Sequence, residues 1–405
     1  MQQNKEGIKD VKNQLLHTPE GVRDIYNEEC ERKIILESRL LSVMKSYGYH
    51  PIQTPTFEFF DIFGKEIGTT PSRDLYKFFD REGNTLVLRP DITPSIARCA
   101  SKYYMEQAIP IRLCYTGNTF RNNSSYQGRL KENTQSGAEL IGDGSVEADA
   151  EMLALSAQLL QAAGLKEFQL SVGHADFLRG LFEAANLEED VMEEIRNLLL
   201  NRNLYGVQEV VEQHVTDENL KQLFALLSDV MLDKDKITAA KAWAQDFPRV
   251  LKALTRLEQL DELLELYNIH KYVSYELAMI SGFNYYTGII FAGYTFGSGE
   301  AIVNGGRYDN LLKSFGKSAP SIGFAVVINQ LMAALQRQNV RIPFENTTKW
   351  FIYSEQYRQD AIKDAQVLRS RGEQVELMPL TEQNTKDVYE KYAEENHIQD
   401  IIFYM

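Results

Sequence analysis

The sequence predicts an α+β protein whose main sheet is largely antiparallel and flanked by helices. Short strand patterns occur in series before residue 175. A stretch rich in Leu, Glu and Ala then occupies residues 175–268 with very few Gly and Pro, and strand patterns return after it. Runs of strands that are separated from runs of helices are typical of α+β proteins, and the long helices argue against a β-sandwich.

The first half of the chain divides into elements by its hydrophobic periodicity. Residues 28–47 carry a broad apolar stripe with helical spacing, and Gly48 ends it. The segment Pro51–Glu58 is extended, and Pro55 within it favours an edge or interface strand. The remaining elements expected before residue 175 are a hairpin at 75–89, a helix at 92–104, strands at 111–121 and 134–142, a helix at 146–163 and a strand at 168–173.

The second half begins with a helical insertion over residues 175–268, after which we expect strands at 272–280 and 288–296. The Gly-rich segment Asn304–Asp309 is interpreted as a turn, and Ser321–Leu335 as the start of a helix. The tail alternates strand and helix as a small βαβαβ unit. We therefore expect a large domain over 1–340, a linker over 341–348 and a small domain over 349–405.

The charge balance argues against nucleic acid as a main partner. Lys and Arg total 43 against 57 Asp and Glu, which gives a formal net charge of −14. Uniform acidity repels a polyanion, so binding would need a local basic patch. The densest candidate, Arg129 to Lys131, is followed at once by Glu132. We therefore expect no nucleic-acid partner.

The composition also indicates a cytoplasmic protein. The three cysteines, Cys30, Cys99 and Cys114, are an odd number without C-x-x-C spacing, which suits a reducing compartment. The N-terminal residues are polar and lack the apolar segment of a signal peptide, and no run of 18 apolar residues occurs. We expect neither a membrane anchor nor a disulfide framework.

Motifs for the commonest catalytic sites are absent. The chain has no phosphate-binding G-x-x-x-x-G-K-[ST] loop, no dinucleotide fingerprint and no G-x-S-x-G nucleophile elbow. The six histidines are scattered, and no pair has the spacing of metal ligands. The residues therefore predict no metal and no cofactor, and on these grounds alone the chain is an α+β protein with a polar pocket.

Six short segments that occur in one order carry more information. They are TPEGVRDI at 18–25, PIQTPTFE at 51–58, LRPDIT at 88–93, FRNNSSYQGRLKENTQSGAELIG at 120–142, MISGFNYYTGIIF at 279–291 and GGRYDNLL at 305–312. Each segment alone is weak, because packing or a tight turn explains it. Together they resemble the catalytic domain of class II histidyl-tRNA synthetases, and the resemblance covers most of Thr18 to Leu335.

This resemblance implies a class II aminoacyl-tRNA synthetase-like sheet of six antiparallel strands and a homodimer with PIQTP at its interface. It also implies a histidine pocket. Asp91, Thr93 and Gln135 are expected to face the α-ammonium or carboxylate group, while Glu139 and Tyr286 take the imidazole nitrogens. The predicted histidine-binding set is completed by Tyr308, which closes the pocket, and by Arg121 and Tyr285.

The departures from the synthetase pattern lie on the side that binds ATP. Ser281 stands where the synthetase has an arginine on the α-phosphate, and Gln330 stands where it has the arginine that braces ATP. Asn123 replaces the glutamate that contacts adenine. Loss of one transition-state donor costs about 10²–10³ in rate, so we expect synthetase activity to be lost. The C-terminal unit also looks like a truncated anticodon-binding domain.

A synthetase-like chain with these losses resembles the regulatory subunits of ATP phosphoribosyltransferase, which acts first in histidine biosynthesis. The resemblance implies a hetero-oligomer with a short-form catalytic subunit, self-association as a homodimer, and L-histidine as the feedback ligand. Two alternatives remain. One is an active but divergent histidyl-tRNA synthetase, and the other is a stand-alone histidine-sensing or tRNA-binding module.

Overall fold

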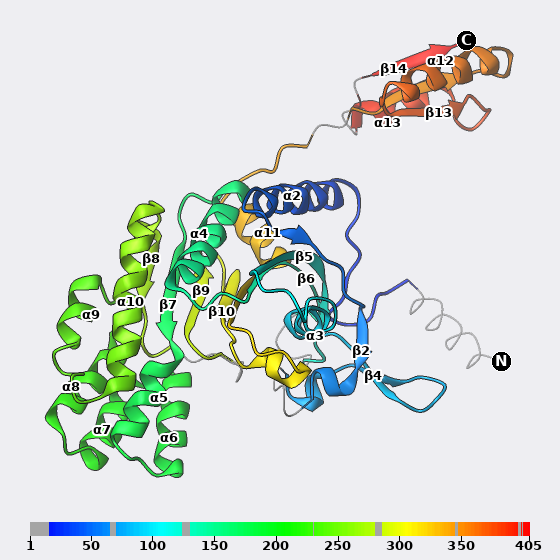
Figure 1. Cartoon of the computed structure of the whole chain (residues 1–405). Helices are drawn as coiled ribbons and strands as arrows, with labels where there is room; N and C mark the ends of the chain where they lie inside the picture. The colour runs from blue at the N-terminus through cyan, green and yellow to red at the C-terminus, as the bar shows by residue number, and fades with distance from the viewer. Residues whose placement is uncertain are drawn as a thin grey trace, which may run out of the picture. The chain divides into compact units, whose positions relative to one another are not determined.

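The computed structural model describes residues 16–64, 70–123, 130–229, 231–279, 286–344, 347–395, 398 and 400–405. The chain forms two compact units, Met1–Ile342 and Pro343–Met405 (Figure 1). Each unit has its own sheet, so each is described by itself. Among the described residues, no helix is both long and apolar enough to cross a membrane.

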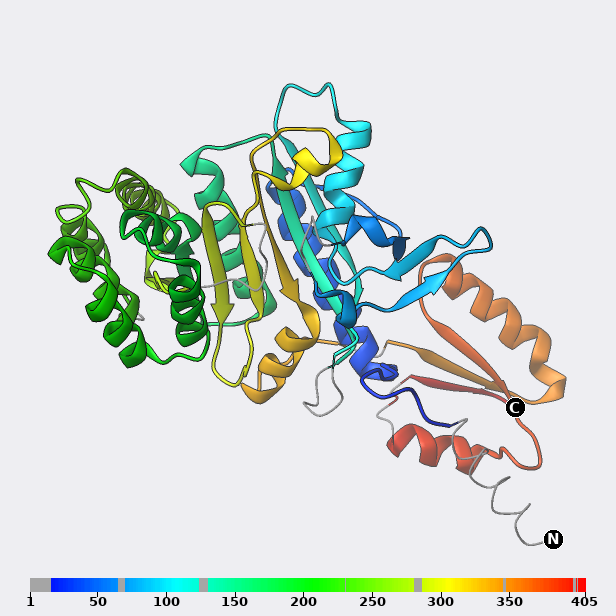
Figure 2. The ribbon, with the colours of Figure 1, turned by 90° about the horizontal axis from the view of Figure 1, so that it is seen from below.

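One eight-stranded sheet organises the first unit (Figure 2). In spatial order its strands are β1 (His50–Pro51), β5 (Ile111–Phe120), β6 (Glu132–Ile141), β11 (Ser321–Val327), β10 (Val303–Arg307), β9 (Ile289–Tyr294), β7 (Gln169–His174) and β8 (Val273–Tyr275). The six strands from β5 to β7 are antiparallel, and the short edge strands β1 and β8 pair parallel with β5 and β7. The predicted α+β class is confirmed, and the sheet is two strands wider than the resemblance implied.

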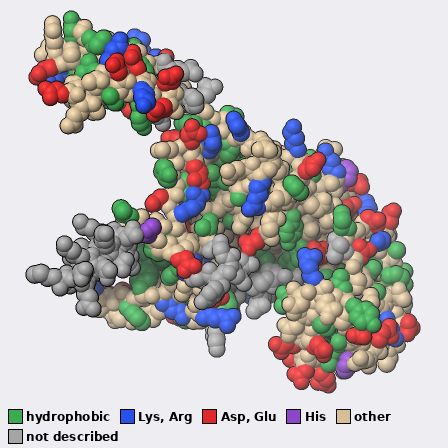
Figure 3. Space-filling view, turned by 180° about the vertical axis from the view of Figure 1, so that it is seen from behind, with side chains coloured by type: hydrophobic (Ala, Val, Ile, Leu, Met, Phe, Trp, Pro, Cys, Tyr) green, Lys and Arg blue, Asp and Glu red, His purple; other side chains and the backbone are tan. Residues whose placement is uncertain are grey.

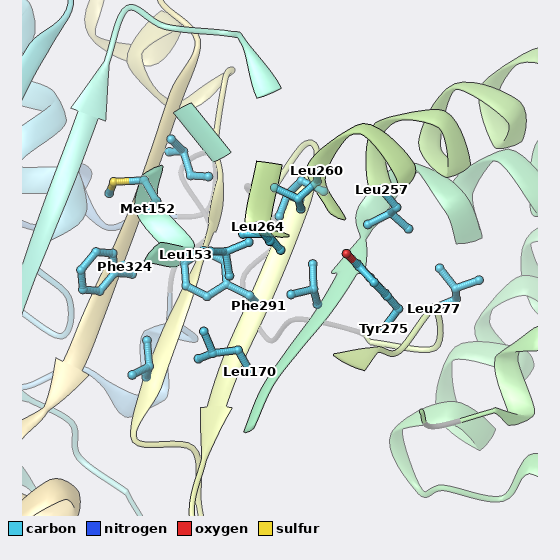
Figure 4. Close-up of a cluster of buried hydrophobic side chains, with 14 of the residues drawn as sticks. Met152, Leu153, Leu170, Leu257, Leu260, Leu264, Tyr275, Leu277, Phe291 and Phe324 are labelled. Atoms are coloured by element: carbon cyan, nitrogen blue, oxygen red, sulfur yellow. The ribbon is translucent and has the colours of Figure 1, made fainter. Parts of the chain in front are cut away.

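The back face of this sheet carries the main hydrophobic core. Against it pack α2 (Asn27–Ser46), α4 (Val146–Ala163) and α11 (Ile328–Arg337). The Ser145 side chain accepts a hydrogen bond from the Ala148 N–H at the start of α4, and Gly164 ends the helix at φ +105°, a value that favours glycine. Met152 and Leu153 of α4 lie against Phe324 and Phe291 of the strands (Figure 4). Burial of this apolar surface is the main force that holds helices to sheet.

Successive side chains of the central strands point to opposite faces of the sheet. On β6, Ala138 and Leu140 belong to the back core, whereas Gln135 and Glu139 point to the front. The front face holds a smaller core around Ile96 of α3 (Thr93–Tyr103). The polar residues on the front face are therefore candidates for a binding site.

The helical insertion follows β7 and returns to the sheet at β8. Its helices are α5 (Ala175–Ala184), α6 (Glu189–Leu200), α7 (Leu204–His214), α8 (Glu218–Ala225), α9 (Lys234–Ala240) and α10 (Pro248–Leu266). The side chains of Asn203, Asp217 and Asp233 each accept a backbone N–H at the start of the next helix. α10 packs against α4 and α5 and joins the insertion to the back core. Asp and Glu side chains are frequent on this insertion (Figure 3).

Two expectations about local structure are wrong. The segment predicted as a Gly-rich turn begins inside strand β10, and the first seven residues of Ser321–Leu335 form strand β11 before α11 begins. Glycine is needed in β10 for space. A Cβ on Gly305 would lie 2.4 Å from the Phe291 ring, and one on Gly306 would lie 2.9 Å from the Tyr286 ring. The two glycines of β10 are therefore explained by packing against distant aromatic rings, although paired glycines in a sequence usually indicate a turn.

A small sheet accompanies the large one at residues 57–88. Its order is β2 (Phe57–Phe59), β4 (Thr85–Leu88) and β3 (Lys77–Phe79), all antiparallel. The β3–β4 hairpin closes at Asp80, whose carboxylate accepts from the Asn84 backbone N–H at 2.7 Å. Phe59 and Phe79 are 55% and 72% exposed, so much of the aromatic surface of this small sheet meets solvent.

The second unit is a three-stranded parallel sheet between two helices. Its elements are β12 (Lys349–Tyr353), α12 (Arg358–Ser370), β13 (Val375–Pro379), α13 (Lys386–Glu395) and β14 (Ile401–Tyr404). The strand order is β13-β12-β14. Trp350 and Ile352 pack on the α13 side, and Phe351 packs on the α12 side. Both outer strands are therefore sheet edges.

Candidate functional site

A polar cavity of about 600 Å³ opens on the front face of the large sheet. Six of the predicted histidine-binding residues line it, namely Asp91, Thr93, Arg121, Gln135, Tyr286 and Tyr308. Sequence analysis missed five other polar lining residues, Thr119, Asn133, Glu300, Asn304 and Arg337. Thr119, Asn133 and Asn304 lie on β5, β6 and β10, whereas Glu300 precedes β10 and Arg337 ends α11. No short segment of the sequence shows that these elements meet at one cavity. Tyr285 and Ser281 lie outside the described residues.

Glu139 lies behind the cavity wall and is fully buried. Its carboxylate accepts a hydrogen bond from the Thr93 hydroxyl at 2.7 Å and one from the Tyr308 hydroxyl at 2.5 Å. Gly323 faces it on β11, where a Cβ would lie only 1.6 Å from Glu139 Oε2. The glycine therefore makes room for the carboxylate. Glu139 holds the two lining hydroxyls in place.

Burial sets the protonation of this carboxyl group. Desolvation raises the pKa of Glu139 from 4.5 to about 8, and the nearby Asp91 contributes in the same direction, although the two hydroxyl hydrogen bonds oppose the shift. At neutral pH the group is therefore largely protonated in the unliganded protein. A ligand that brings two N–H donors or a positive charge favours the ionised form.

Two oxygen acceptors lie further along the cavity wall. Asp91 is 6% exposed and its Oδ1 accepts from the Thr93 backbone N–H at 3.3 Å, at the start of α3. Gln135 Oε1 is buried and has no hydrogen-bond partner among the described residues. A buried acceptor without a partner costs about 1–3 kcal/mol, so a donor from a ligand is favoured here. A carboxylate and an amide oxygen on one wall suit an ammonium group.

Both cavity tyrosines have charged side chains of other elements beside them. Tyr308 is buried, and its neighbour Arg307 forms an ion pair with Asp149 of α4 at 2.6 Å. Asp149 is fully buried and also pairs at 2.6 Å with Arg256 of α10. Tyr286 accepts at its backbone carbonyl from Arg179 of α5 at 3.0 Å. The helical insertion therefore contacts the supports of both tyrosines.

Sequence analysis did not identify this ion-pair cluster. Arg307 lies in the GGRYD segment, but nothing near it in the sequence indicates Asp149, which is 158 positions away. The pairing depends on the packing of α4 against the sheet at β11, the neighbour of β10. The sequence signal for this ion pair was Arg307 itself, because an arginine that is buried needs an acidic partner.

The outer part of the cavity carries the remaining polar groups. Arg121 lines it, and its Nε donates to the Pro90 carbonyl at 3.3 Å. Gln330 Nε2 donates to Glu300 Oε2, also at 3.3 Å. At the position where the synthetase pattern has its ATP-bracing arginine, this chain therefore presents a neutral amide bound to an acid. The cavity thus lacks a cation at position 330, although Arg121 and Arg337 line it.

Comparison with known proteins places the chain in a family. The family model described as Histidyl-tRNA synthetase matches residues 21–331. An ATP phosphoribosyltransferase regulatory subunit of Acetivibrio thermocellus is 39% identical over 362 residues, which are 89% of this chain and 86% of that protein. The chain belongs to the family of ATP phosphoribosyltransferase regulatory subunits. Another regulatory subunit, from Ruminiclostridium cellulolyticum, is 38% identical and covers 96% of this chain and 92% of its own length.

Solved structures agree with this family. A Bacillus halodurans C protein described as an ATP phosphoribosyltransferase regulatory subunit/histidyl-tRNA synthetase superposes with a TM-score of 0.84 at 32% identity. The match covers 96% of this chain and 98% of that one. Histidyl-tRNA synthetase from Nostoc sp. PCC 7120 gives a TM-score of 0.76 at 19% identity, covering 95% and 90% of the two chains. This second likeness shows that this chain has the synthetase fold.

Proposed function

We propose that this chain is a non-catalytic regulatory subunit that a short-form ATP phosphoribosyltransferase catalytic chain requires, and that its cavity binds L-histidine as the feedback ligand. The observation that carries the ligand assignment is the buried Gln135 Oε1 without a partner, on the same cavity wall as Asp91. These two acceptors suit the α-ammonium group of an amino acid.

The imidazole end of the proposed ligand lies near Tyr286 and Tyr308. Glu139 does not line the cavity, so an imidazole N–H reaches it by replacing the Thr93 or Tyr308 hydroxyl as the donor. The exchange leaves the carboxylate with two donors, as in the unliganded protein. An analogue without that N–H cannot make this exchange and leaves the hydroxyl bound to Glu139, so it lacks the ligand's contact with the carboxylate.

The proposed loss of synthetase activity rests on the outer part of the cavity. Gln330 is neutral and is bound to Glu300, and Asn123 lines the cavity where the synthetase pattern has an acid. Ser281 replaces the α-phosphate arginine of the pattern and Gln330 replaces the arginine that braces ATP, so charge that develops during adenylation has less stabilisation. Binding without reaction then allows histidine to shift the equilibrium of an attached catalytic chain, with a coupling of about 1–3 kcal/mol.

Homodimerisation through the PIQTP segment is also proposed. β1 is the outermost strand of the large sheet beside this segment, and Ile52 N–H donates to the Cys114 carbonyl at 2.8 Å as the sheet ends. Phe59 and Phe79 lie exposed on the neighbouring small sheet. Exposed aromatic residues beside a sheet edge are typical of a subunit contact.

Calorimetric titration of the purified chain tests the ligand assignment. L-Histidine should bind, and imidazolepropionate, which lacks the ammonium group, should bind at least about tenfold more weakly. Gln135→Met removes the acceptor at similar volume, so it should weaken histidine binding and reduce the difference between the two ligands. Gly299→Ala is the matched control, because Gly299 lines the cavity and an added Cβ there meets nothing within 4 Å. Equal losses for both ligands would count against the ammonium assignment.

Reconstitution tests the regulatory role. A short-form catalytic chain should be active only when this chain is added, and histidine should inhibit the complex less when it contains Gln135→Met. The second candidate, a divergent synthetase, is favoured by Arg121, which still lines the cavity. Histidine-dependent exchange of pyrophosphate into ATP by the purified chain would establish that alternative and exclude ours.

A further inference from the structure

The two edges of the C-terminal sheet differ in their protection. On β13 the outward-facing Val375 carbonyl already accepts two hydrogen bonds from Arg369, at 2.6 and 3.2 Å. Pro379 has no N–H to offer on the same edge, and Glu376 adds an exposed charge. Proline, charge and capped carbonyls are the devices that keep an edge strand from pairing with another chain.

Among the described residues, the β14 edge has no proline and no capped outward carbonyl, and the charge beside it is Lys386, whose Nζ lies 5.1 Å from the centre of the Phe403 ring. The Asp400 carbonyl accepts from the Trp350 N–H of β12 at 2.8 Å, and the Tyr404 carbonyl accepts from the Ser354 N–H just after β12 at 2.9 Å. Because successive residues of a strand point their backbone groups to opposite sides, the N–H and C=O groups of Ile401 and Phe403 face outward. In the part of the chain that the structure describes, no strand pairs with that side of β14.

The side chains of this edge are apolar and uncharged. Residues 401–405 read IIFYM, without Pro, Gly or a charged residue. Ile402 is 45% exposed and Met405 is 55% exposed. An uncharged apolar edge with free backbone groups is a template for adding a strand.

We propose that β14 pairs antiparallel with β14 of a second copy of this chain, about a two-fold axis beside Phe403. In this register Phe403 faces its own copy and exchanges both backbone hydrogen bonds with it. Ile401 faces Met405 of the second copy, and Ile402 faces Tyr404. All outward backbone groups of Ile401 and Phe403 are then satisfied.

Self-complementarity favours a second copy as the occupant. An isologous contact brings each residue opposite a residue of the same short segment, and in β14 every such pair is apolar or aromatic. The same operation on β13 meets Pro379 and the Arg369-capped carbonyl. The assembly therefore closes as one continuous six-stranded sheet and does not grow into a filament.

Hydrogen exchange and sedimentation velocity of the full chain test the pairing. The amides of Ile401 and Phe403 should exchange fast in dilute protein and slow at high concentration, in step with a rise in sedimentation coefficient. The outward Leu377 amide on the protected β13 edge is the internal control, and its exchange should not change with concentration. The proposed PIQTP contact does not involve these amides, so it does not produce this pattern.

A pair of substitutions at Ile402 separates pairing from folding. Ile402→Lys adds a charge to the edge and should weaken the self-association that depends on β14 about tenfold or more, whereas Ile402→Val should not. Slow exchange of the β12 amides in both variants verifies that the unit is folded. The proposal is overturned if exchange at Ile401 and Phe403 does not depend on concentration. It is equally overturned if the lysine variant, with β12 protected, associates like the wild type.

Discussion

Arg179 of the helical insertion donates a hydrogen bond to the backbone carbonyl of Tyr286, with 3.0 Å between Nη2 and the oxygen. A second arginine of the insertion, Arg256, reaches Asp149, which in turn holds Arg307 beside Tyr308. Both tyrosines of the cavity are therefore supported from one helical element. A chain that contacts the insertion has a physical route to the cavity.

Arg179→Gln should weaken histidine binding about threefold, because a partly exposed charged hydrogen bond contributes about 0.5–1 kcal/mol. The measurement is calorimetric titration with L-histidine. Arg196→Gln is the matched control, since Arg196 also lies on the insertion but contacts Glu189 and the Phe182 ring, neither of which lines the cavity. Equal affinities for the two variants would show that the carbonyl contact does not position Tyr286.

Asp149→Asn should lower the free energy of unfolding by about 3 kcal/mol, because Arg307 would stay buried without its main counter-ion. Urea unfolding followed by circular dichroism measures the change. The exposed pair of Glu189 and Arg196 provides the comparison, and Glu189→Gln should cost less than about 0.5 kcal/mol. A similar small cost for Asp149→Asn would mean that Asp309 alone suffices to balance Arg307.

Gly323→Ala should displace the Glu139 carboxylate, because the added Cβ would lie 1.6 Å from Oε2. Backbone shift or loss of the Tyr308 contact then follows, and we expect histidine binding to fall below detection together with a lower melting temperature. Gly299→Ala changes the same residue type in the same cavity without a contact. Normal binding by the Gly323 variant would place the ligand away from Glu139.

Glu139→Gln should change how stability depends on pH. The folded chain holds a proton on Glu139 up to a pKa of about 8, whereas the unfolded chain releases it near 4.5. The folded state therefore binds more protons between these values, so the stability of the wild type falls as pH rises and the loss is complete above about 8. A glutamine at position 139 does not titrate, so the variant lacks this pH-dependent contribution to the free energy of unfolding.

The measurement is the melting temperature of the unliganded variant and wild type at pH 5.5, 7 and 8.5. The melting temperature of Glu139→Gln minus that of the wild type should increase with pH and exceed about 2 °C at pH 8.5. Glu189→Gln, at an exposed site, should run parallel to the wild type. A constant difference at all three values would mean that the Glu139 carboxyl titrates near its ordinary pKa.

The fold was predictable where local pattern and tertiary contacts agree. The period-two alternation of β6 put Gln135 and Glu139 on one face, and the long apolar stripes located the helices. The fold was not predictable at β10. There Gly305 and Gly306 are required because the rings of Phe291 on β9 and of Tyr286 leave no room for a Cβ, and the local sequence does not show these rings. The two-residue strand β1 gives no periodic signal of its own.

In the candidate site, too, some features were predictable from the sequence and others were not. Motif position located six lining residues, of which five lie at or beside the end of a strand or helix and Gln135 lies inside β6. It did not show that Glu139 lies behind Thr93 and Tyr308, because that placement depends on the glycine opposite it in β11. The support of the cavity by Arg179 and Arg256 depends on how the insertion docks, which no short segment encodes.

The protonated state of Glu139 also has a calorimetric consequence. A ligand that needs this carboxyl as an anion displaces its proton, and the proton is taken up by the buffer. The heat of binding near pH 7 then includes the ionisation enthalpy of the buffer, so Tris and phosphate would give different apparent enthalpies for the same affinity. The slope of that difference counts the protons that Glu139 releases.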